Sequence, residues 1–220
     1  MEKIALESLR LIAADYVSQQ VIDELRSEGI YSIKNSPNVY VNVVLVSTDK
    51  GADNVNKILE THACERRNVV IKMNPELSIK EESDIFSILY FHADSNPYLE
   101  LKKFLQLYNI CIEKHGILCF DLSDFLIVIR GRNVISTHSY VYKKDITEAL
   151  AHLKSIYIKE NGRYILAITI ANDYTDEMKK ITLPEKMMSP LSDYMESLPV
   201  YLTITIATPK TLTLFTSVPL

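Results

Sequence analysis

The run of residues 39–47, VYVNVVLVS, constrains the fold of this chain more than any other part of the sequence. Five of its residues are valine, none is charged, and the turn-forming residues Ser36-Pro37-Asn38 precede it. A continuous run rich in β-branched residues is typical of a strand that helices cover on both faces. The run therefore predicts a central strand of an α/β protein.

The segments around this strand alternate between helical and extended patterns. Apolar residues at helical spacing predict a helix over 3–28, which Gly29 ends. A second helix is predicted to open at Gly51, and strands are predicted at 68–73 and 84–91. Strands that alternate with helices predict a parallel sheet with crossover helices.

A long helix is predicted over 98–116, after Asn96-Pro97. Its apolar residues recur at the spacing of one helix face: Leu101, Phe104, Leu105, Tyr108, Cys111 and Ile112. We therefore expect three parts, a reduced N-terminal α/β lobe (1–97), the connecting helix (98–116) and a C-terminal α/β domain (117–220).

The last ninety residues predict a second, mixed sheet. The patterns favour strands and helices in this order: strand 134–142, helix 145–158, strand 163–171, helix 184–197, strand 200–207 and strand 212–218. The last two strands flank Thr208-Pro209-Lys210-Thr211, which predicts a hairpin. The predicted fold class is thus α/β with two lobes: a small N-terminal sheet, and a C-terminal mixed sheet covered by two helices, joined by the long helix.

Composition and charge exclude several classes of protein. The net charge of −4 gives no basic field for nucleic acid or an anionic membrane. No apolar run is long enough for a membrane span or a signal peptide, and three cysteines do not form a disulfide framework. We expect a cytoplasmic protein that neither inserts into membranes nor binds nucleic acid.

Nucleotide binding is not expected, because the chain lacks a glycine-rich phosphate loop. Its five glycines are far apart, and neither G-x-x-x-x-G-K-[ST] nor G-x-G-x-x-G is present. One weak candidate joins the central strand to the next helix: Thr48, Lys50 and Gly51. An ordinary strand-to-helix turn explains this loop better, and we expect no cofactor.

A metal site is also not expected. Cys111, His115 and Cys119 are four residues apart, but this spacing lacks the C-x-x-C pattern and a fourth ligand. Cys111 lies in the apolar stripe of the long helix, where cysteine behaves as a small hydrophobic residue.

The acidic pair Asp121 and Asp124 is the most suggestive candidate for a functional site. Two carboxylates three residues apart on a turn can orient a water molecule or bind a cation. They can equally cap a helix or satisfy local backbone donors. An enzymatic site would need a polar cleft near His92, Asp94 and Asp121, yet no set of acid, base and nucleophile can be named. The sequence therefore favours a protein that is not an enzyme without deciding the question.

A resemblance to the tubulin/FtsZ superfamily appears at this point in the chain. The long helix followed by Gly116-Ile117-Leu118-Cys119-Phe120-Asp121-Leu122-Ser123-Asp124 resembles the core helix and acidic loop of that family, G-x-x-N-x-D-x-x-D. Asp121 and Asp124 match the two acids, and Cys119 replaces the asparagine. The order of elements after 134 is also similar to the family's second domain, so the resemblance covers 98–220.

The resemblance implies a function in assembly. In the family, the two acids act on the GTP of the next subunit in a filament. The first lobe here is short and lacks the family's G-G-G-T-G-T-G signature, so the resemblance implies no GTP hydrolysis by this chain alone. We expect a degenerate, non-catalytic member that binds or regulates a filament or self-associates. The alternative is an unrelated α/β adaptor or ligand-binding module.

Overall fold

A computed structural model describes most of the chain, namely residues 3–33, 36–62, 67–80, 84–114, 120–143, 146–156, 158–170, 192 and 200–220. The chain divides into two compact units. The first comprises 1–109, 129–136 and 219–220, and the second comprises 110–128 and 137–218. The predicted three-part division with boundaries at 97 and 116 stays a prediction.

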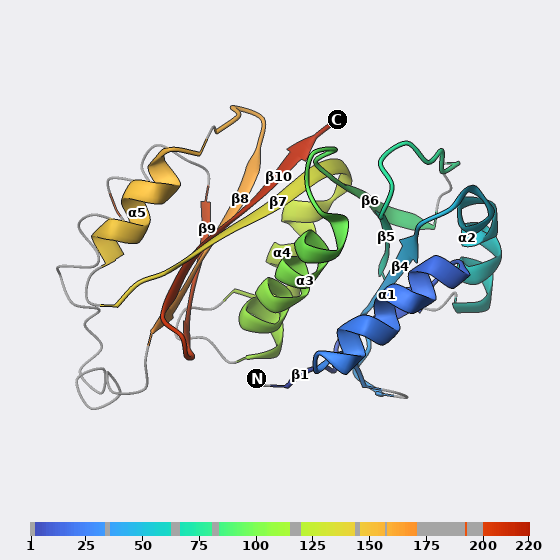
Figure 1. Ribbon diagram of the computed structural model, residues 1–220, viewed down its shortest axis with the longest axis horizontal. Helices are drawn as coiled ribbons and strands as arrows, with labels where there is room; N and C mark the ends of the chain where they lie inside the picture. Colours follow the sequence, from blue (N-terminus) through green and yellow to red (C-terminus); the bar gives the residue numbers. More distant parts are fainter. Residues whose placement is uncertain are drawn as a thin grey trace. The chain divides into compact units, whose positions relative to one another are not determined.

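Parallel strands form the centre of the first unit (Figure 1). They pair in the order β2 (Leu9–Ala13), β4 (Val41–Val46), β5 (Arg67–Lys72), β6 (Ile85–Phe91) and β7 (Gly131–Val141). All six residues of β4 are buried. The prediction of a central strand at 39–47 is therefore confirmed.

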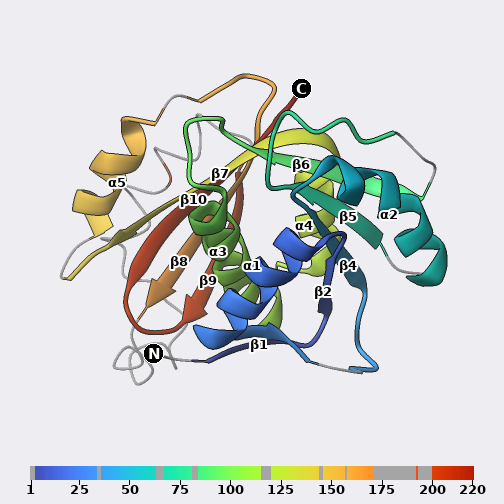
Figure 2. The same ribbon diagram turned by 45° about the vertical axis from the view of Figure 1, so that its right-hand side comes forward.

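Helices cover both faces of these strands, which is why β4 is buried throughout. They are α1 (Tyr16–Ser27), α2 (Asp49–His62) and α3 (Pro97–Tyr108). Val44 of β4 packs in one cluster with Val55 and Leu59 of α2. The side chain of Val43 points to the opposite face and is also fully buried. On that side α1 and α3 lie next to each other (Figure 2), and Lys102 Nζ lies 2.5 Å from Glu28 Oε2.

Local signals explain where α1 and α3 begin and end. Asp15 caps the start of α1, and Gly29 follows its end with φ at +88°, a conformation that glycine adopts without strain. The Asn96 side chain caps α3, and Pro97 occupies its first turn, where a missing N–H removes no helical hydrogen bond. The long-helix prediction is confirmed for 98–108. The segment η1 (Asn109–Glu113) continues it as a π-helix.

The predicted helix over 3–28 is wrong in its first half. This part contains β1 (Ile4–Leu6) and β2, and β1 pairs in parallel with β3 (Ile30–Ser32) in a separate two-stranded sheet. Leu9 and Leu11 are buried two residues apart, as in a strand, and only after Asp15 does the buried pattern become helical. Because apolar residues lie on both sides of Asp15, the strand pattern before it and the helical pattern after it together resemble one helix.

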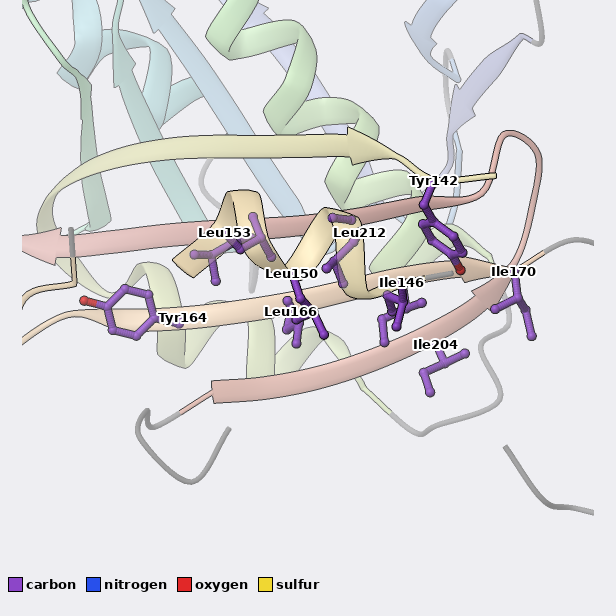
Figure 3. Close-up of a cluster of buried hydrophobic side chains, with 12 residues drawn as sticks. Tyr142, Ile146, Leu150, Leu153, Tyr164, Leu166, Ile170, Ile204 and Leu212 are labelled. Atoms are coloured by element: carbon purple, nitrogen blue, oxygen red, sulfur yellow. The ribbon is translucent and has the colours of Figure 1, made fainter. Parts of the chain in front are cut away.

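In the second unit, one cluster of buried side chains lies between a described helix and one face of the strands. Its described elements include α4 (Leu122–Ile129), α5 (Ile146–Lys154), β8 (Arg163–Ile170), β9 (Val200–Ile206) and β10 (Thr211–Pro219). Ile146, Leu150 and Leu153 of α5 pack with Leu166 of β8 and Leu212 of β10 in a cluster of buried side chains (Figure 3). The predicted helix at 184–197 lies outside the described residues, except for residue 192.

The strand order corrects two predictions. Apart from β1 and β3, the described strands form one mixed sheet in the order β2-β4-β5-β6-β7-β10-β8-β9. We had predicted separate N- and C-terminal sheets. The predicted hairpin of 200–207 with 212–218 is also wrong, because β8 lies between β9 and β10. β8 pairs antiparallel to β10 and parallel to β9.

Among the described residues, no helix has the length and apolar character required to cross a membrane.

Candidate functional site

The Asp15 side chain joins the two loops that follow β2 and β4. Its Oδ2 atom accepts hydrogen bonds from the backbone N–H groups of Ser47 (2.9 Å) and Thr48 (3.1 Å). Its Oδ1 atom accepts from the N–H of Ser18 at 2.8 Å. These donors lie at the starts of α2 and α1, where the helix dipole favours negative charge. One carboxylate therefore interacts with the N-termini of two helices.

Further contacts hold the two loops together. The hydroxyls of Ser18 and Ser47 are 2.9 Å apart. Thr48 caps α2, because its Oγ1 atom accepts from the N–H of Gly51 at 3.1 Å. A Cβ atom at Gly51 would lie 2.1 Å from Asp15 Oδ2. Gly51 is therefore the residue that lets α2 approach the Asp15 carboxylate.

These hydrogen bonds also set the ionisation of Asp15. Burial raises its pKa, but the backbone hydrogen bonds from Ser18, Ser47 and Thr48, together with the Ser18 hydroxyl, outweigh burial. The net effect holds the pKa of Asp15 below the usual value of an aspartate. The side chain is accordingly an anion at neutral pH.

The weak phosphate-loop candidates lie at the start of α2. Thr48 acts as the cap, Lys50 is exposed in the first turn, and Gly51 is buried against Asp15. The backbone N–H groups of Ser47 and Thr48, at the position where a phosphate would be expected, already donate to Asp15.

The acidic pair Asp121 and Asp124 forms a reciprocal cap at the start of α4. The N–H of Asp124 donates to Asp121 Oδ1 at 3.0 Å, and the N–H of Asp121 donates to Asp124 Oδ2 at 3.3 Å. The Phe125 N–H donates to the Asp121 carbonyl at 3.1 Å. This is the arrangement of a capping box with aspartate at both positions. The Asp121 side chain is exposed and Asp124 is half-buried.

The other candidates are dispersed. The described residues contain no group of three or more His, Cys, Asp or Glu side chains that could hold a metal ion. Cys111 is a free, buried thiol whose pKa is raised by burial, and His115 and Cys119 lie outside the described residues. His92 and Asp94 are exposed after β6 in the first unit, whereas Asp121 belongs to the second.

The sequence analysis did not identify Asp15, whose carboxylate accepts hydrogen bonds from Ser18, Ser47 and Thr48. Its signal is local and was available: an aspartate three residues before Ser18, at the point where apolar residues take up helical spacing, is typical of an N-cap. Its second set of contacts, to Ser47 and Thr48, spans more than thirty positions and has no sequence signature.

Comparison with known proteins gives structural matches only. No protein-family model matches the sequence, and no curated protein is similar to it in sequence. FtsZ from M. jannaschii is similar in structure, with a TM-score of 0.50 and 11% identity over 99% of this chain and 91% of that chain. CetZ2 from Haloferax volcanii, solved as a GTPγS-bound protofilament, has a TM-score of 0.53 and 10% identity over 91% of this chain and 69% of that chain.

These matches define the class of the molecule: it has a tubulin/FtsZ-like fold with a divergent sequence. The resemblance seen in the sequence over 98–220 is thereby confirmed at the level of fold. The structural likeness also extends over the first unit, where the sequence carries no glycine signature. At these identities the likeness concerns the fold alone.

Proposed function

We propose that this chain acts by protein–protein assembly, on a filament or with copies of itself, and hydrolyses no GTP of its own. The fold supports assembly, because CetZ2, which shares it, was solved as a protofilament. The absence of GTP hydrolysis is supported by the Asp15 carboxylate. This carboxylate accepts hydrogen bonds from the N–H groups of Ser47 and Thr48 in the strand-to-helix loop.

The acidic loop at Asp121 and Asp124 is the surface that we propose to face a neighbouring subunit. Each carboxylate uses one oxygen in the cap of α4, Oδ1 of Asp121 and Oδ2 of Asp124. The second oxygen of each is not needed for that cap, so the same pair can hold the helix and present negative charge. The resemblance to the tubulin/FtsZ superfamily assigns these two positions to contacts along a filament.

Co-sedimentation tests this proposal. The chain is pelleted alone and with GTP-assembled FtsZ-like filaments, as the wild type and as the Asp124→Asn and Asp124→Ala variants. Asn keeps an oxygen acceptor for the cap and removes the charge, whereas Ala removes both. We expect the wild type to pellet and Asp124→Asn to lose most of its pelleting while keeping its thermal midpoint. Equal pelleting of all three proteins, or no pelleting of any, would contradict the proposal.

The alternative of an unrelated adaptor module loses its structural basis. It required a fold unlike that of tubulin and FtsZ, and the structural likeness covers nearly the whole chain.

A further inference from the structure

We propose that the Asp15 carboxylate occupies an anion-binding position, here called the oxyanion position, which backbone N–H groups form between the N-termini of α1 and α2. By occupying this position, Asp15 keeps ligands that carry a carboxylate or a phosphate from binding there. The inference deepens the proposed function, since it explains why that function needs no bound nucleotide. Its test involves no assembly, so its failure can be distinguished from a failure of the co-sedimentation experiment.

The donors around Asp15 go beyond those of a helix cap. A capping aspartate binds N–H groups of its own helix, as Asp15 does with Ser18 at 2.8 Å. Asp15 also accepts from Ser47 and Thr48, which are 32 and 33 residues away in the sequence. These donors belong to a different loop and a different helix. The carboxylate therefore occupies an oxyanion position that two separate segments build together.

Backbone N–H groups, and no positively charged side chain of the described residues, stabilise the negative charge of Asp15. Ion pairs in the described part of the chain, such as Glu28 with Lys102, do not involve Asp15. Backbone N–H groups and helix dipoles, together with the Ser18 hydroxyl, stabilise the Asp15 charge. Backbone donors of this kind bind both carboxylates and phosphates.

The Asp15 carboxylate also fills the space in front of Gly51 at the start of α2. A Cβ atom on Gly51 would meet Asp15 Oδ2 at 2.1 Å and its Cγ at 3.0 Å, so no atom can be added between the carboxylate and α2. Because the N–H groups of Ser47 and Thr48 already donate to Asp15 Oδ2, a free oxyanion can use these donors only where the Asp15 side chain is absent. Shortening the side chain should vacate the position while the donors of Ser47 and Thr48 stay.

The Asp15→Ser variant separates this inference from a simple cap. Serine still caps α1 but is too short to reach Ser47 and Thr48. Thermal midpoints are measured in formate, phosphate and chloride at equal ionic strength, with Asp23→Ser on the exposed face of α1 as the matched control. We expect Asp15→Ser to melt below the wild type in chloride and to recover by ~3 °C or more in formate or phosphate. The wild type and Asp23→Ser should show no such recovery.

Two results would overturn the proposal. The first is an anion response of Asp15→Ser no larger than that of Asp23→Ser. The second is calorimetric binding of inorganic phosphate to the wild type as tight as to Asp15→Ser. If Asp15→Ser does not fold in chloride, the folded fraction is compared after refolding in each anion. Recovery in formate or phosphate supports the proposal, and equal failure in all three solutions contradicts it.

Discussion

The absence of a side chain at Gly51 allows α2 to lie close to the Asp15 carboxylate. Replacing glycine by alanine inside a helix normally adds up to ~1 kcal/mol of stability. Here the new Cβ would lie 2.1 Å from a carboxylate oxygen that two backbone N–H groups hold in place. We expect Gly51→Ala to lower the free energy of unfolding by about 1–3 kcal/mol, measured by urea denaturation.

A double-mutant cycle controls for other causes of this loss. In an Asp15→Ala background the obstructing carboxylate is gone, so Gly51→Ala should be neutral or stabilising. The coupling energy between the two positions should then exceed ~1 kcal/mol. Additive effects of the two substitutions would show that the contact between Gly51 and Asp15 is not the cause.

The pH dependence of stability provides a second prediction about Asp15. Its pKa in the folded state lies below its value in the unfolded chain, so folding favours the ionised form. The stabilisation is present above the unfolded-state pKa, about 3.9, and is lost as the pH falls through the lower folded-state pKa. We expect Asp15→Asn to have a lower free energy of unfolding than the wild type at pH 7, with the difference closing as the pH falls below about 4. A gap that stays constant down to pH 3 would argue against this account.

At the scale of elements, the capping box of α4 is open to a direct test. Asp121→Ala removes the acceptor for the Asp124 N–H at the start of an eight-residue helix. We expect a loss of about 0.5–2 kcal/mol in the free energy of unfolding, and a much smaller loss for Asp121→Asn, which keeps the acceptor. Ser123→Ala, an exposed neighbour, is the control and should change stability by less than ~0.5 kcal/mol. If Asp121→Ala and Asp121→Asn lower the free energy of unfolding equally, the capping hydrogen bond is not the cause of the loss.

Elements with one uniform pattern could be predicted from the sequence, and elements that meet at a change of pattern could not. Residues 41–46 are apolar almost throughout, and the strand follows directly. Residues 9–27 pass from a strand to a helix at Asp15, where side chains on both sides are apolar, and a single helix was predicted. The capping reading of Asp121 and Asp124 was available, because capping is a local interaction.

At the scale of the whole molecule, non-local pairing set the limit of prediction. The turn residues Thr208-Pro209-Lys210-Thr211 suggested a hairpin, yet β10 pairs with β8 along 212–217 and β9 pairs with β8 from the other side. Six consecutive pairs, from Leu212 with Ile168 to Ser217 with Arg163, stabilise an arrangement that no short segment specifies. The contacts of Asp15 with Ser47 and Thr48 escaped prediction for the same reason.

For the whole molecule, we propose assembly that does not depend on nucleotide. Sedimentation velocity of the full chain over a range of concentrations, with and without GTP and magnesium, tests it most directly. For the chain by itself, we predict larger species that increase with protein concentration and that are the same in the presence and absence of GTP. A single monomeric species under every condition, or assembly that appears only with GTP, would contradict the account.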